Sequence, residues 1–137
     1  MEPVFQSVLH GLPVLLTHFV VTLALLGAGV WLYTTLTPYS EIALIRGGNT
    51  AAAVSFSGAI LGLAIPLATC MASSVGVLDI ALWGAVTLIL QIASYRVADL
   101  LLRELPARIV NGELGPAITL VAIKLSVASL NAAAVTG

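Results

Sequence analysis

Lys124 has the clearest chemical potential in this chain, because it is a charged residue inside a long apolar stretch. It follows the start of that stretch by about eleven residues, which places it roughly 16 Å deep in a helix at 1.5 Å per residue. An unpaired lysine near the middle of a bilayer costs about 2.5–3.5 kcal/mol. We therefore expect Lys124 to face the protein interior and to have a polar partner.

The candidate partners of Lys124 are two ionisable side chains in other apolar segments, His18 and Asp79. Helix rise places both about 11 Å further toward the outer face than Lys124, a gap that a snorkelling lysine closes in part. One hypothesis is an outward-facing cluster of His18, Asp79 and Lys124. The alternative is that His18 and Asp79 contact water at the interface while Lys124 bonds serine or asparagine. Gln91 and Asn131 are expected to hydrogen-bond between helices, at about 0.6 kcal/mol each.

No arrangement of residues in the sequence predicts catalysis. It contains no Ser-His-Asp order, no HExxH motif and no glycine-rich phosphate loop. Cys70 lies in an apolar stretch and is interpreted as a small buried hydrophobe that forms no metal cluster with His10 or His18. We predict that the protein is not an enzyme and that it binds no metal and no cofactor.

The elements that must position these residues follow from composition. The chain has 137 residues, of which 60% are hydrophobic and 8% charged, and its mean hydropathy is +1.13. A surface with so few polar groups requires lipid as its solvent. Four apolar segments are long enough to cross a bilayer, at about residues 12–36, 50–72, 77–97 and 114–135. The predicted fold is therefore all-α, with one four-helix transmembrane domain over residues 1–137.

Charge indicates how these helices are oriented. The net charge is −1 with no basic stripe, which argues against nucleic-acid binding. The arginines outside the apolar segments fall in or beside the loops at about 37–49 and 97–113, which the positive-inside rule makes cytoplasmic. Both termini are then periplasmic. Residues 97–112 are expected to form either a short interfacial amphipathic helix or an extension of the third span.

An offset of 64 residues aligns the two halves of the chain. The pairs include Trp31 with Tyr95, Ile45 with Ile109, Gly48 with Gly112 and Asn49 with Glu113. The halves would be two parallel two-helix repeats, at about 12–72 and 77–135. Chance similarity is the alternative.

Small residues dominate the second span. Ser55, Gly58 and Gly62 lie on it, and the two glycines form a GxxxG pair that predicts close helix packing. The alternative is a pore surface lined by Thr50, Ser55, Ser57 and Thr69. The aromatic residues are interpreted as interfacial belts, with Trp31, Tyr33 and Tyr39 at the inner face and Trp83 toward the outer face.

Several motifs give the chain a family resemblance. They are Leu36-Thr37-Pro38-Tyr39-Ser40-Glu41, Asn49-Thr50-Ala51-Ala52-Ala53 and Ser55-Phe56-Ser57-Gly58. With these motifs, nearly the whole chain resembles the bacterial inner-membrane family called domain of unknown function 350. The resemblance implies a multi-pass protein built from a repeated two-helix unit, and it implies no particular activity.

Two functions fit these expectations. The first is a structural or interaction module of a membrane-associated system, homo-oligomeric and serving partners such as membrane-stress proteins. Its basis is the small size of the chain, its small-residue faces and its lack of catalytic groups. The second is an oligomeric channel or transporter for a small solute or ion, with Lys124 on the path.

Overall fold

A computed structural model describes residues 1–73 and 76–136 of the chain. The described residues form six helices: α1 (Glu2–Leu36), α2 (Glu41–Arg46), α3 (Thr50–Ser73), α4 (Val77–Leu102), α5 (Leu105–Val110) and α6 (Leu114–Thr136). Four of them, α1, α3, α4 and α6, are long and apolar enough to cross a membrane. The prediction of an all-helical protein with four candidate spans is confirmed.

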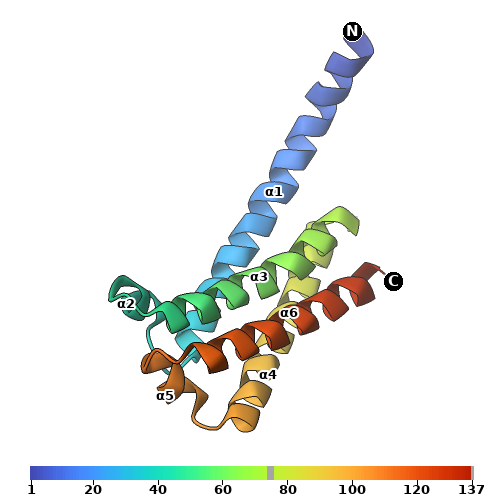
Figure 1. Ribbon diagram of the computed structural model, residues 1–137. Helices are drawn as coiled ribbons and strands as arrows, with labels where there is room; N and C mark the ends of the chain where they lie inside the picture. The colour runs from blue at the N-terminus through green and yellow to red at the C-terminus, as the bar shows by residue number, and fades with distance from the viewer. Residues whose placement is uncertain (74–75, 137) are drawn as a thin grey trace.

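The other three long helices pack against α3. The contact between α3 and α6 is the most extensive in the molecule, and α3 also packs against α4 and α1. Figure 1 shows the short helices α2 and α5 at one end of the bundle and both chain termini away from that end. We call the end that carries α2 and α5 the loop end. The connection from α3 to α4 includes residues 74 and 75, which lie outside the described residues.

Helix α1 is longer than its apolar segment predicts, because it begins at Glu2 and not near residue 12. Pro3 stands in its first turn, where a missing N–H costs nothing, and Glu2 suits the positive end of the helix dipole. Its 35 residues extend about 52 Å, against about 30 Å for the hydrocarbon core. Figure 1 shows its first half projecting beyond the other helices.

The loops contain more helix than the sequence predicts. Pro38 ends α1 as expected, but the short helix α2 follows it, with Ser40 accepting a bond from the Ala43 N–H. The stretch 97–112 combines both predicted alternatives. Helix α4 continues to Leu102, and α5 follows with Leu105 and Ile109 fully buried.

The two short helices end in the same turn. Gly48 and Gly112 both have positive φ, at 88° and 81°, a conformation that favours glycine. In the first turn the Asn49 N–H donates to the Leu44 carbonyl at 2.9 Å. In the second the Glu113 N–H donates to the Arg108 carbonyl at 3.0 Å. Each turn delivers the chain directly into a long helix, α3 or α6.

Asn49 explains why α3 begins at Thr50. Its Oδ1 accepts the Ala52 N–H at 2.9 Å, which caps the helix. Its Nδ2 donates to the carbonyls of Ile109 and Val110 at 3.1 and 3.0 Å, at the end of α5. One side chain therefore satisfies both helix ends and joins the two halves of the chain. Ala51 and Ala52 are fully buried beside it.

Candidate functional site

Lys124 is completely buried in the middle of α6. Its Nζ donates a hydrogen bond to the Tyr33 hydroxyl on α1. The same nitrogen lies 3.9 Å from the centre of the Tyr33 ring and 5.5 Å from that of Tyr95 on α4. Both distances are within the range in which an aromatic face attracts a cation. We call Lys124, Tyr33, Tyr39, Glu41 and Tyr95 the lysine site.

Helices α1, α4 and α6 position the two rings and the amine next to one another. Tyr33 and Tyr95 meet edge to face, with centroids 6.3 Å apart and planes at 87°. One turn before Tyr95, the Gln91 Nε2 donates to the Lys124 carbonyl at 3.3 Å. Gln91 fits there because Gly62 has no side chain, and a Cβ at Gly62 would lie 2.6 Å from Gln91 Oε1. Asn131 ties the same two helices, since its Nδ2 donates to Thr87 Oγ1 at 2.8 Å.

Glu41 brings an acid to the lysine site from α2. Its side chain is 1% exposed, and its Oε1 accepts the Thr37 hydroxyl at 2.7 Å. Burial raises the pKa of Glu41, while the Thr37 hydrogen bond and the charge of Lys124 lower it in part. Glu41 and Lys124 make no direct ion pair within the described chain. Two buried groups of opposite charge therefore interact without touching.

Four buried oxygens around this region have no hydrogen bond of standard geometry among the described residues. They are Tyr39 Oη, Glu41 Oε2, Gln91 Oε1 and Tyr95 Oη. Burial raises the pKa of Tyr39, and Ser55 and Tyr95 lie near enough to its hydroxyl to lower it in part. Buried polar oxygens are nearly always hydrogen-bonded, to protein or to ordered water. Their concentration here distinguishes the lysine site from the apolar remainder of the bundle.

A small cavity borders the lysine site at the loop end of α1. Its volume is about 10 Å³, and its lining includes Tyr33, Thr37, Tyr95 and Arg96. Roughly 10–15 Å³ is the least volume that admits one water molecule. Arg96 is exposed, so this cavity lies between the surface of the protein and the two tyrosines.

The predicted partners of Lys124 are wrong. Asp79 is exposed near the start of α4 and His18 is half-buried on α1, whereas the Lys124 amine is bonded to Tyr33. Tyr33 is three residues before the end of α1, so the lysine extends toward the loop end and not toward the opposite end, where Asp79 lies. Serine or asparagine, the other expected partners, do not bond the amine among the described residues.

The aromatic-belt interpretation is wrong for two tyrosines and stays a prediction for the two tryptophans. Trp31 and Trp83 are 67% and 42% exposed, as belt residues would be. Tyr33 is buried against Lys124, and Tyr39 is half-buried with its hydroxyl inside the protein. Tyr33 and Tyr95 are not predicted as lysine partners, because charge and depth indicate only acids and histidines. Glu41 is not predicted either, although it ends the first family motif.

The glycines of α3 pack within one chain. A Cβ on Gly58 would lie 2.7 Å from Val121 Cγ2 on α6, and Gly62 faces Gln91 on α4. The expected helix packing is therefore intramolecular, and this face is not free for a second copy. The alternative pore surface does not form one face either, because Ser55 is buried while Thr50 and Ser57 are exposed.

The described residues contain no group of three His, Cys, Asp or Glu side chains that could hold a metal ion. Cys70 is buried and unpaired in the described structure. The chemistry that the lysine site can perform with its own groups is the binding and transfer of protons.

Comparison with known proteins agrees with the membrane architecture. The chain is 29% identical over 131 residues to the "UPF0719 inner membrane protein YjfL" of Escherichia coli (strain K12), covering 96% of this chain and 99% of the relative. The protein of the same name from Escherichia coli O157:H7 matches equally. No solved structure gives a significant match. By homology, this chain is a multi-pass protein of the inner membrane.

The family model described as Domain of Unknown Function (DUF350) matches residues 7–135, nearly the whole chain. The match includes three candidate spans completely, the first from residue 7 onward, and every residue of the lysine site. The chain therefore belongs to the DUF350 family.

Proposed function

We propose that this protein is a homo-oligomeric interaction module of the inner membrane, in which two parallel helix–short helix–helix units surround the lysine site. The proposal rests on one observation, a difference between the surfaces of α1 and those of the other three long helices. The polar and glycine contacts of α3, α4 and α6 are made inside one chain, whereas α1 offers small and apolar residues that face outward.

The turns after α2 and α5 support the two-unit arrangement. Equivalent residues at the 64-residue offset make equivalent bonds, from Gly48 to Ile45 and from Gly112 to Ile109, at 3.0 and 2.9 Å. The glycines in both turns share a left-handed conformation. In this arrangement both short helices and the four arginines face the cytoplasm, and both termini face the periplasm. Periplasmic alkaline phosphatase activity from a C-terminal fusion, absent from a fusion after Arg46, tests that orientation.

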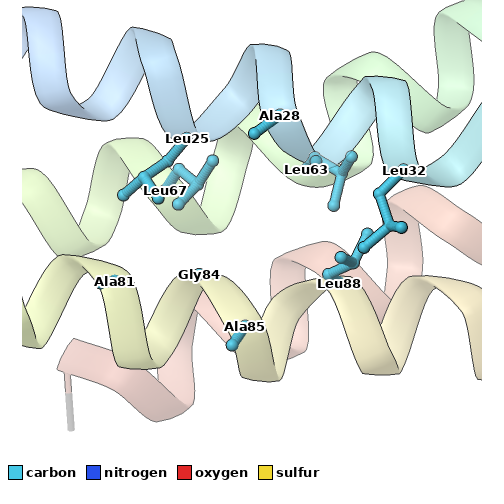
Figure 2. Close-up of a pocket in the computed structure, with 10 residues that line it drawn as sticks. Leu25, Ala28, Leu32, Leu63, Leu67, Ala81, Gly84, Ala85 and Leu88 are labelled. Carbon is cyan, nitrogen blue, oxygen red and sulfur yellow. The ribbon is translucent and has the colours of Figure 1, made fainter.

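The surface for self-association is a crevice between α1 and α4. It has a volume of about 180 Å³ and is almost entirely apolar. Figure 2 shows side chains of α1, α3 and α4 around it. Its small residues are Ala28, Gly29, Ala81, Gly84 and Ala85. Small residues let helices approach closely in membranes, where helix contact depends on packing.

A second copy of this chain is the occupant that fits the crevice. A further apolar crevice of about 190 Å³ lies between α1 and α3. Helix α1 therefore contacts the bundle loosely along two of its sides. No residue is buried within the most apolar stretch of α1. The whole helix is also longer than the hydrocarbon core of a bilayer is thick. A helix from a neighbouring protomer would cover surfaces that the chain itself leaves open.

Ala28→Leu and Ala85→Leu test this interface, because both alanines are exposed and line the crevice. Each leucine should fill the crevice and shift the protein in lipid nanodiscs toward monomer, measured by mass photometry. Ala24→Leu is the matched control, since Ala24 is exposed on α1 one turn away and does not line the crevice. A monomeric wild-type protein, or equal oligomers in all three variants, would contradict the proposal.

A channel with Lys124 on the path between protomers is less well supported. Lys124 is 0% exposed and its amine is on tyrosines of its own chain. A ring of lysines around an oligomer axis would need this side chain on an outer face. Anion flux in proteoliposomes that disappears in Lys124→Ala would favour the channel over the interaction module.

A further inference from the structure

The lysine site contains the components of a proton relay. An ammonium donor bonds a tyrosine hydroxyl, and a buried carboxyl group interacts with the same ammonium through space. The two are Lys124 on α6 and Glu41 on α2, with Tyr33 of α1 as the shared neighbour. Glu41 Oε2 and the Tyr95 hydroxyl have no hydrogen bond among the described residues. A carboxylate oxygen without a donor is a strong proton acceptor in a buried environment.

The cavity beside Arg96 is the space through which a water molecule would reach the tyrosines. It is large enough for about one water molecule at the lower limit, and Tyr33, Thr37 and Tyr95 form its polar wall. Two residues of this wall contact the ends of the relay: Thr37 donates to Glu41 Oε1, and the Tyr33 hydroxyl accepts from the Lys124 amine. Arg96, at its rim, is exposed at the loop end of the bundle.

We propose that the lysine site is a proton-binding site reached by water from the loop end, in which Lys124 and Glu41 share one proton through Tyr33. In the transfer, an N–H bond of the Lys124 ammonium breaks and its proton moves to Tyr33 Oη. The original hydroxyl proton of Tyr33 leaves to a bound water molecule, which passes a proton to Glu41 Oε2. Ammonium and carboxylate become amine and carboxylic acid, the tyrosine and water are unchanged, and net charge is conserved.

The titratable groups that face the site come from each surrounding element. Helix α1 contributes Tyr33, the following connection Tyr39, α2 Glu41, and α4 Tyr95. Arg96 and Asp99 follow Tyr95 in sequence, and Asp99 Oδ1 accepts the Leu105 N–H. The only ionisable side chain of α3 is Cys70, toward the other end of the helix, and α6 carries none besides Lys124. Glu41 is therefore the acid that interacts with the amine.

The protonation of Lys124 can be followed directly by NMR, because it is the only lysine of the chain. The full-length protein, labelled with 15Nζ-lysine in lipid nanodiscs, gives one side-chain NMR signal to follow across pH. In Glu41→Gln the pH midpoint of this signal should fall by one unit or more, a tenfold loss of proton affinity. Glu104→Gln, which removes an exposed acid near α5, should leave the midpoint unchanged. Equal midpoints in wild type, Glu41→Gln and Glu104→Gln would overturn the proposal.

A second measurement uses the wild-type protein and does not depend on the folding of any variant. Magnetisation transferred from water protons should reach the Lys124 ζ signal, because the relay needs water at the site. Tyr33→Phe keeps the ring but removes the hydroxyl, and it should slow this exchange at least tenfold. A wild-type ζ signal without contact to water would exclude the relay, whatever the variants do.

Discussion

Helices α1 and α3 have similar hydropathy but contact the rest of the protein in opposite ways. Half of the most apolar stretch of α3 is buried, and none of the corresponding stretch of α1. Helix α3 has ten buried residues, many of them small, whereas the buried residue of α1 is Tyr33. Hydropathy therefore identifies both as spans but does not distinguish the central helix from the peripheral one. The distinction comes from side-chain size on α3 and from one polar contact on α1.

The largest effect on stability is expected from a substitution that disrupts the close packing of α3. Gly58→Leu should destabilise the protein by about 3 kcal/mol or more, because its Cβ would meet the Val121 side chain at 2.7 Å and the Val121 backbone at 3.2 Å. Gly27→Leu on α1 is the control, since a Cβ there meets nothing within 4 Å. Unfolding of both variants in mixed detergent micelles measures the difference. Similar stabilities would show that the two helices are packed alike.

The next effect concerns the one buried contact of α1. Tyr33→Phe should cost about 2 kcal/mol, because it leaves a buried amine without its oxygen acceptor. Tyr95→Phe removes a hydroxyl that has no bond among the described residues, and it should cost less than about 1 kcal/mol. The same unfolding assay compares them. A larger loss of unfolding free energy in Tyr95→Phe would mean that α4, and not α1, supplies the main contact to Lys124.

The pH dependence of stability tests the buried acid next to this anchor. Because the pKa of Glu41 is raised above its usual 4.5, the folded state binds the proton more tightly than the unfolded state. Stability should therefore fall as pH rises from about 4.5 to the raised pKa, by about 1.4 kcal/mol per pH unit in this window. Glu41→Gln should abolish the decline, while Glu104→Gln preserves it. A wild-type stability that rises over this window would contradict the burial of Glu41.

The smallest effect lies on the packed side of the bundle. Asn131→Ala removes the hydrogen bond to Thr87 and should cost about 0.6 kcal/mol, the average for such bonds between membrane helices. Ser129→Ala on the same helix is the control, since its hydroxyl bonds only the Leu125 carbonyl of its own helix turn. A cost of several kcal/mol for Asn131→Ala would mean that polar bonds contribute as much as glycine packing.

Much of the fold could be predicted from local signals. Apolar length identifies the four spans, Pro38 ends α1, and the Asn49 side chain caps α3 where the sequence suggests. Helix α2 is missed because it is too short for periodicity to indicate. Apolar length predicts the start of α1 too late, because the helix continues before the apolar segment to its first turn at Pro3.

The lysine site could be predicted only in part. Depth along a helix shows that Lys124 needs a partner, but depth is one coordinate, and the direction of the side chain depends on helix packing. His18 and Asp79 were chosen by depth and charge. Tyr33 is the actual neighbour because the long lysine side chain reaches from α6 to α1 and because a hydroxyl and a ring face both accept a cation. No local pattern in α1 distinguishes Tyr33 from the exposed Trp31.

The position of Lys124 in the last span has a consequence for biogenesis. Chains are synthesised from the N-terminus, so α1, α2 and α4 have been made before α6 emerges. Tyr33, Glu41 and Tyr95 are then already available when the membrane receives its most costly residue. The lysine enters beside acceptors that precede it in the chain, which offsets an insertion cost of about 2.5–3.5 kcal/mol. Because of this order of helices, the residues that contact the Lys124 amine are synthesised before Lys124 itself.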